Sequence, residues 1–150
     1  MRDEIWSHRP PPAAGPATSV LWRCAPATAS ELTDSRARLR GRLADGDGPP
    51  EADGEPLDTL LLAFEELGSN ALRHGLPPVE ITVTLAAGTW VLDVSDAAPG
   101  RGPAPAVDRD PAAGGLGLHL IARLAVAHGW DSHDGRKHVW ACIVAAPDPG

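Results

Sequence analysis

Two neighbouring segments of this chain, residues 79–85 and 89–96, alternate apolar and polar side chains. This period of two is that of a β-strand with one buried face, and the short link at 86–88 contains a glycine. The two segments are therefore predicted to form an antiparallel hairpin. Because a sheet with one apolar face must bury that face, the rest of the chain has to supply a layer that covers it.

Two helices are predicted before this hairpin. The first takes Thr28 or Ser30 as its N-cap and stops at Gly46. The second runs from about Leu57 to His74, with Gly75 as its C-cap. The apolar positions of the first helix recur at helical spacing: Leu32, Leu39 and Leu43.

A third helix and a second hairpin are predicted to complete the fold. Residues 114–129 become helical after their glycines, and residues 129–134 and 137–145 flank a turn at Gly135. With a first strand at 18–24, the order is strand, helix, helix, hairpin, helix, hairpin. This order predicts an α+β fold, a two-layer sandwich of a mostly antiparallel sheet with about three helices on one face.

The length of 150 residues fits one domain, predicted to span residues 17–146. Residues 1–16 are predicted to be a disordered leader, because 7–16 hold four prolines and little to bury. Residues 147–150 are predicted to fray. The proline-rich stretch 97–113 has no apolar period, and such a long loop in a compact domain is usually functional or disordered.

Composition excludes several classes of protein. The net charge of −7 argues against nonspecific nucleic-acid binding, which needs a clustered basic face. No apolar run has the length of a membrane span or of a secretory signal, so a cytoplasmic protein without membrane contact is expected. Cys24 and Cys142 are too few for a disulfide scaffold and are expected to be buried thiols.

The second predicted helix carries the strongest functional signal. At about 100° per residue around the helix axis, Asn70 lies about 40° from Glu66 on one side, and Arg73 lies about 20° from Glu66 on the other side. His74 follows along the same edge, whereas Glu65 points elsewhere. This polar edge borders a separate apolar face, so we expect a pocket there. The apolar face contains Leu57, Leu60, Phe64, Leu67 and Ala71.

Two further features add to this edge. Asp96 ends a predicted strand, and a glycine-rich run, Gly114, Gly115 and Gly117, leads into the third helix. Each feature alone is weak, because Asp96 could cap a turn and the glycines could simply ease a loop into helix packing. The order of acid and amide, strand-end aspartate, proline-rich loop and glycines is more specific.

In this order the sequence resembles the GHKL (histidine kinase-like) ATPases, and most closely their anti-sigma-factor serine/threonine kinase branch, over roughly residues 18–146. EELGSNALRHG, at 65–75, resembles the N-box of that branch. VSDAAPG, at 94–100, and AGGLGL, at 113–118, resemble its two glycine boxes, and GRKHVWACI, at 135–143, resembles its closing strand.

The resemblance implies a Bergerat-type fold that binds ATP with Mg²⁺. It makes Asn70 the magnesium ligand and Glu66 the general base. Asp96 would accept a hydrogen bond from the adenine amino group, and Gly115 and Gly117 would offer backbone N–H groups to the phosphates. The other cofactor-binding positions implied by the motifs are Arg73, His74, Gly100, Gly114, Leu116 and Leu118.

The sequence departs from the family pattern at two positions, where Ala98 and Ala113 replace glycines of the boxes. A methyl group at either position can crowd the backbone near the nucleotide, so we expect weakened nucleotide affinity. Arg101 and Arg109 lie in the lid at 97–113 and could contact the terminal phosphate, although solvated arginines are the commoner outcome in such a loop.

The resemblance also implies a function and partners. A protein of this branch phosphorylates a Ser or Thr of an anti-sigma antagonist of the STAS type, sequesters a sigma factor, and forms a homodimer. The alternative, favoured by the two alanines, is a non-catalytic module of the same fold whose affinity for a protein partner depends on nucleotide.

Two other sequence features have simpler interpretations. A cluster of histidines and aspartates near the C-terminus lacks the i, i+4 helical pair of a zinc enzyme, so a structural metal is the less favoured interpretation. It comprises His128, Asp131, His133, Asp134 and His138. Most of the five tryptophans are expected to pack in the core or on a sheet face, whereas Trp6 has no predicted role.

Overall fold

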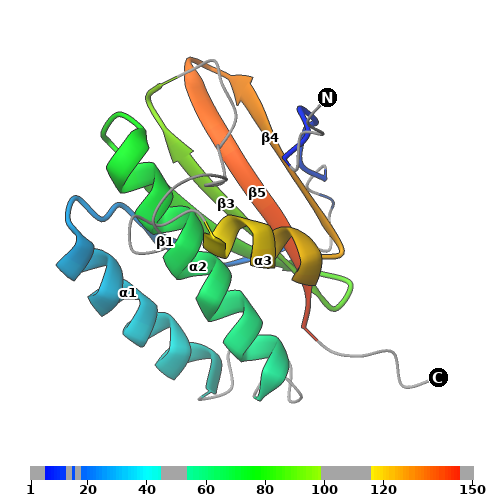
Figure 1. Ribbon diagram of the computed structural model, residues 1–150. Coiled ribbons are helices and arrows are strands. Elements are labelled where there is room, and N and C mark those ends of the chain that lie inside the picture. The colour runs from blue at the N-terminus through cyan, green and yellow to red at the C-terminus, as the bar shows by residue number, and fades with distance from the viewer. Residues whose placement is uncertain (1–5, 13–14, 16–17, 45–53, 99–115, 146–150) are drawn as a thin grey trace.

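The computed structural model describes residues 6–12, 15, 18–44, 54–98 and 116–145. One five-stranded antiparallel sheet, in the order β1-β2-β3-β5-β4, carries three helices on one face (Figure 1). The predicted two-layer α+β sandwich is thereby confirmed. The elements are β1 (Ser19–Cys24), α1 (Ala29–Arg42), α2 (Glu55–His74), β2 (Glu80–Ala86), β3 (Thr89–Asp96), α3 (Leu116–Leu124), β4 (Ala127–His133) and β5 (Arg136–Val144).

The hairpin of β2 and β3 forms as its alternation predicts. Ile81 and Val83 of β2 and Leu92 of β3 are fully buried beneath the helices. The two residues between the strands, Ala87 and Gly88, have φ values of 52° and 75°. Two successive positive φ values characterise the tight turn whose twist matches that of paired strands, which explains the sharp reversal.

Helix α1 begins where the sequence predicts. Thr28 is its N-cap, and the Thr28 hydroxyl accepts a hydrogen bond of 3.1 Å from the backbone N–H of Glu31. The Glu31 carboxylate accepts in return from the backbone N–H of Ala27, which fixes the entry of the chain into the helix. Leu32 and Leu39 are fully buried, as their spacing predicts.

Helix α2 is the central helix of the covering layer. It packs against α1 and α3 and lies over β3 and β5 (Figure 1). Its N-terminal end follows Gly54 and has a proline in the first turn, which suits a helix start, and it ends at Gly75 as predicted. Its buried residues are Leu57, Leu60, Leu61, Ala63, Phe64, Leu67, Gly68 and Ala71.

Helix α3 is shorter than the helix predicted within residues 114–129. It ends at Leu124, and β4 already begins at Ala127. The backbone N–H of Val126 donates to the carbonyl of Cys142 on β5, so the chain joins the sheet three residues before the predicted end of the helix. Pairing with β5 satisfies the backbone of this segment and overrides its apolar, helix-compatible sequence.

Residues 6–9 are part of the fold, which corrects the prediction of a disordered leader for this segment. The backbone N–H of Trp130 donates to the carbonyl of Ser7, and the backbone N–H of Arg9 donates to the carbonyl of Trp130. The segment thus lies parallel to β4 at the edge of the sheet. Trp6 is only 3% exposed and meets His128 edge to face, so it belongs to the hydrophobic core.

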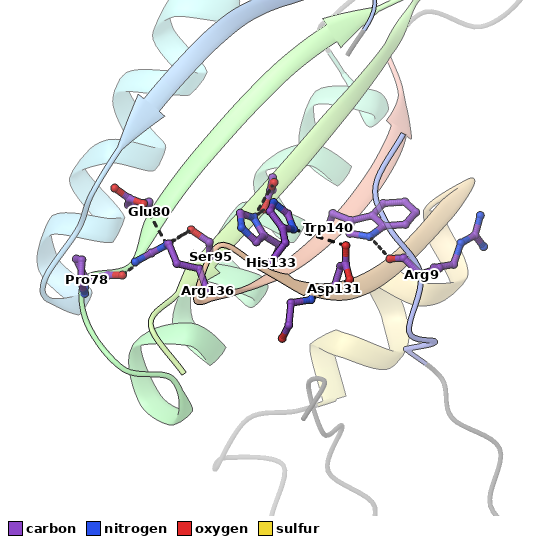
Figure 2. A network of polar contacts seen from close by, with 11 residues as sticks. Arg9, Pro78, Glu80, Ser95, Asp131, His133, Arg136 and Trp140 are labelled. Carbon is purple, nitrogen blue, oxygen red and sulfur yellow. Dashed lines mark hydrogen bonds and ion pairs between the residues drawn. The ribbon is translucent and has the colours of Figure 1, made fainter. Parts of the chain in front are cut away.

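The same segment also covers part of the sheet face that carries no helix. The indole N–H of Trp140 donates to the carbonyl of Arg9, and the Arg9 guanidinium lies 5.4 Å from the centre of the Trp140 ring (Figure 2). A Cβ at Gly129 would collide with the Arg9 side chain, so glycine at this position permits the segment to pack closely.

We predict that Trp6→Ala destabilises the protein strongly. The substitution removes a buried indole from the core, and such truncations cost about 3 kcal/mol or more. Urea unfolding followed by circular dichroism would measure the loss. Val20→Ala, at a side chain that is 49% exposed, is the matched control and should change stability little. Equal effects of the two substitutions would contradict the placement of Trp6 in the core.

Candidate functional site

The polar edge predicted on α2 exists and borders the buried face of that helix. Glu66 and Asn70 are half-buried, one helical turn apart, while their neighbours Leu67 and Ala71 are buried in the core. Arg73 and His74, in the last turn, are exposed, as their position beyond the core requires. The acid and the amide therefore stand at the boundary between core and solvent, where a ligand can reach both.

The side chain of Glu66 reaches the first turn of α3. A Cβ placed on Gly117 would collide with the Glu66 side chain at Cγ, Cδ and Oε2. The carboxylate thus occupies space that any larger residue at position 117 would fill. Two predicted site residues that lie far apart in the sequence are brought together in this way, and the N-terminal end of α3 faces the polar edge of α2.

The environment of Glu66 changes its acidity. Burial raises the pKa of this carboxyl above its ordinary value, the neighbouring charge of Glu65 raises it further, and Arg73 opposes both. A carboxylate with a raised pKa is a stronger proton acceptor near neutral pH. This property suits a general base, although it also arises at half-buried carboxylates without a catalytic role.

Asp96 is buried at the end of β3 and is 1% exposed. One of its carboxylate oxygens, Oδ1, accepts from the backbone N–H of Ala98 at 2.7 Å and from that of Leu76 at 3.4 Å. The next residue also contacts Leu76, because the backbone N–H of Ala97 donates to the carbonyl of Leu76. These contacts bind the end of β3 to the segment that follows α2.

Gly75, the C-cap of α2, lies directly against the Asp96 side chain. A Cβ at this position would collide with the Asp96 carboxyl group and would stand 2.8 Å from the carbonyl oxygen of Ala71. The close approach of helix and strand therefore requires a glycine here, which gives the predicted helix-ending Gly75 a second purpose.

Sequence reasoning missed one residue at this end of the sheet. Lys137 of β5 is opposite Asp96 in the strand register, and its Nζ atom lies 3.6 Å from Asp96 Oδ2. Its side chain is 11% exposed. The sequence could have indicated this residue, because the chain's single lysine alternates in phase with the inward-facing residues of β5: Val139, Ala141 and Ile143.

Several predicted site positions fall outside the described residues. Gly100, Gly114 and Gly115 are among them, as are Ala113 and most of the lid at 97–113. Leu116 is the first residue of α3, and Leu118, in the same helix, is buried in the core. Ala98 is described, and its backbone N–H is used by Asp96.

The described residues fit a Mg²⁺–nucleotide complex. The amide oxygen of Asn70 is a suitable hard ligand for Mg²⁺, and a half-buried carboxylate stands one turn away. Glycine at position 117 leaves room for the Glu66 side chain beside the first turn of α3, and the N–H groups and dipole at a helix start favour phosphate. Asp96 supplies a buried acceptor that can read the amino group of a base.

The opposite face of the sheet holds a separate pocket of about 440 Å³. Its lining residues, which include Arg23, Thr82 and Asp93, contain none of the predicted site residues. The pocket therefore lies away from Glu66 and Asn70.

The polar side chains of this face are bonded to one another. Arg136 donates to Ser95 Oγ and to the carbonyl of Pro78, and it forms an ion pair of 3.3 Å with Glu80 (Figure 2).

Two of the C-terminal histidines, His133 and His138, also lie on this face. The imidazoles of His133 and His138 stack with centres 4.0 Å apart, and His138 Nδ1 is 3.1 Å from Asp93. The hydrogen bond with Asp93 raises the pKa of His138 despite partial burial. Among the described residues, no group of three or more His, Cys, Asp or Glu side chains could hold a metal ion.

The described residues form a two-layer α+β sandwich with a polar edge on α2. The family model described as "Histidine kinase-like ATPase domain" matches residues 26–143. The chain belongs to this family, and membership implies ATP binding. No curated protein matches the sequence. In the described part of the chain, no helix has the length and apolar character needed to cross a membrane.

We predict that Glu66→Gln changes stability in a pH-dependent way. Because the folded state raises the pKa of Glu66, it favours the protonated form, and ionisation costs stability as the pH rises from the ordinary value through the raised one. The glutamine variant should therefore melt at a higher temperature than wild type at pH 7, with the difference vanishing in acid below the ordinary value. Melting curves across this pH range test the sign, and a variant that melts lower at pH 7 contradicts it.

We also predict that Gly75→Ala destabilises the protein by about 2 kcal/mol, because the new methyl group overpacks the contact with Asp96. Gly41→Ala is the matched control. Gly41 lies in α1 with no described atom within 4 Å of an added Cβ, so alanine there should stabilise the helix by about 0.5–1 kcal/mol. Urea unfolding of both variants should give opposite signs.

Proposed function

We propose that this protein is an ATP-dependent serine/threonine kinase that phosphorylates an anti-sigma antagonist of the STAS type and sequesters a sigma factor when that antagonist is absent. The proposal is supported by membership of the histidine kinase-like ATPase family and by the motif resemblance to the anti-sigma kinase branch. It includes a homodimer as the acting form, as in that branch.

The observation that carries the kinase assignment is the setting of Glu66. The carboxylate is half-buried, its pKa is raised, and it meets the start of α3 at Gly117. That place is where the terminal phosphate of a nucleotide held by the helix N-terminus would lie. A proton acceptor beside a phosphoryl group can serve an incoming hydroxyl.

The transfer would proceed by attack of a Ser or Thr hydroxyl oxygen on the terminal phosphorus of ATP. The bond from that phosphorus to the bridging oxygen breaks, and ADP leaves with the electron pair. The proton of the hydroxyl passes to the carboxylate of Glu66. Such reactions depend chiefly on positioning and on neutralising phosphate charge rather than on covalent chemistry of the protein.

Asn70 would hold Mg²⁺ in this scheme. The ion, when bound, supplies positive charge to the phosphate oxygens, and an amide oxygen with water and phosphate ligands suits its octahedral preference. The position of Asn70 one turn beyond Glu66 keeps the ion and the base on the same edge of α2.

A non-catalytic, nucleotide-dependent binding module is the second candidate. It is favoured by the state of Asp96, whose carboxylate already receives the backbone N–H of Ala98 and the ammonium of Lys137. A site so occupied can bind nucleotide weakly and use it only to alter affinity for a protein partner. Nucleotide binding without any transfer to candidate antagonists would favour this module over the kinase.

We predict that Glu66→Gln reduces phosphoryl transfer by at least about a hundredfold while ATP still binds, because general-base catalysis contributes about 10²–10⁴. Transfer from labelled ATP to purified STAS-type antagonists would be measured beside ATP binding. Glu65→Gln, at the adjacent carboxylate, is the matched control and should retain transfer within about threefold. Undiminished transfer in Glu66→Gln would remove Glu66 from the role of base.

A further inference from the structure

Arg136, on the sheet face that carries no helix, joins the two segments of chain that flank Asp96. Its Nη2 atom donates to the carbonyl of Pro78 at 2.6 Å, and its Nε and Nη2 atoms lie 3.1 and 3.0 Å from Ser95 Oγ (Figure 2). Glu80 adds an ion pair of 3.3 Å. One guanidinium therefore holds the start of β2 and the residues before it against the end of β3.

The same two segments also meet at Asp96, on the other side of the sheet. Ser95 and Asp96 are consecutive residues of β3, so their side chains point to opposite faces. The backbone N–H of Leu76 donates to Asp96 Oδ1 at 3.4 Å, and the carbonyl of Leu76 accepts from the N–H of Ala97 at 2.8 Å. Arg136 and the Asp96 carboxylate thus connect the segment after α2 to the end of β3 from opposite faces.

The contact made by Arg136 is the stronger of the two connections. The bond from Leu76 to Asp96 is long for an N–H···O hydrogen bond, so a small displacement of the segment would break it. The bond from Arg136 to the Pro78 carbonyl is short, and its donor is charged, which makes such bonds about twice as strong as neutral ones. The guanidinium therefore determines where Leu76 stands relative to Asp96.

This set of contacts needs the geometry of an arginine. The planar guanidinium donates from two nitrogen atoms in fixed directions and so reaches both the Pro78 carbonyl and Ser95 Oγ. A lysine ammonium keeps the charge but donates from a single atom on a flexible stem. Because the Arg136 side chain is only 21% exposed, water replaces these bonds poorly when they are lost.

We propose that Arg136 is a positioning residue for nucleotide binding, which fixes the Asp96 carboxylate for the adenine amino group by holding the segment after α2 against the end of β3. Arg136 acts through Ser95 and Pro78 from the face opposite to that of Asp96. The inference rests on the proposed nucleotide-binding function and adds a residue that sets the affinity and base selectivity of that site.

Competition of ADP and GDP against fluorescent ADP, on the full chain with Mg²⁺, tests this role. Wild type should prefer ADP, because Asp96 accepts from the adenine amino group and opposes the carbonyl that guanine presents there. Arg136→Lys should weaken ADP binding at least about tenfold and GDP binding less, since a displaced carboxylate no longer distinguishes the bases. Arg23→Lys, at an exposed arginine on the same face, is the matched control and should stay within about twofold of wild type.

The ratio of the two affinities separates positioning from a merely structural role. An equal loss of ADP and GDP in Arg136→Lys overturns the inference, as does an unchanged affinity for ADP. Wild type that binds ADP with no preference over GDP also overturns the inference but leaves the proposed function standing. Failure of wild type to bind either nucleotide overturns both.

A second variant tests the contact from its other side. Ser95→Ala removes one acceptor and leaves Arg136 bonded to Pro78 and Glu80, so the fold should persist while the preference for ADP falls about threefold. The double variant with Arg136→Lys should lose no more than Arg136→Lys alone, because both changes break the same contact. An unchanged preference in Ser95→Ala, or additive losses in the double variant, contradicts the proposed role.

Discussion

The buried carboxylate of Asp96 is the contact on which the arrangement of this molecule depends. It receives backbone N–H groups from Leu76, which follows α2, and from Ala98, which follows β3, and it pairs with Lys137 on β5. Three segments that are distant in sequence are thereby joined at one end of the sheet. Loss of the carboxylate would leave a buried lysine unpaired and two backbone donors without their acceptor.

Close approach at two glycines places α2 relative to its surroundings. Gly75 lets the end of α2 reach Asp96, and Gly117 lets the start of α3 reach Glu66. The polar edge of α2 is thus fixed between the sheet and the third helix, and the positions of Glu66 and Asn70 follow from packing elsewhere in the fold. Substitutions at either glycine are expected to disturb the site without touching its chemical groups.

The sequence alone predicts much of this fold because the period of two in β2 and β3 and the spacing of Leu32 and Leu39 in α1 report burial directly. The helix predicted from the sequence extends beyond the observed end of α3. The reason is that the hydrogen bond from the Val126 N–H to the carbonyl of Cys142 joins residues that are distant in the sequence. The packing of residues 6–9 was not predicted because their hydrogen-bond partner, Trp130, is also distant in the sequence.

For the candidate site, the motifs identified Glu66, Asn70 and Asp96, and the structure adds the contacts of Glu66 with Gly117 and of Asp96 with Gly75. Their chemical roles remain predictions. Lys137 was missed although it is the only lysine, because the inward phase of β5 becomes significant only when Asp96 is seen opposite it. A charged side chain on a buried strand face is a signal that sequence reasoning can use.

The N-terminal segment also covers one edge of the sheet. Residues 6–9 occupy the β4 edge of the sheet, and prolines at 10–12 follow, so this side offers little regular backbone for further pairing. At the other edge, the register of β1 shifts between Val20 and Trp22. Such an irregularity discourages continuation of a sheet. The homodimer proposed above would therefore form through a face, not by extending its sheet from one subunit into the next.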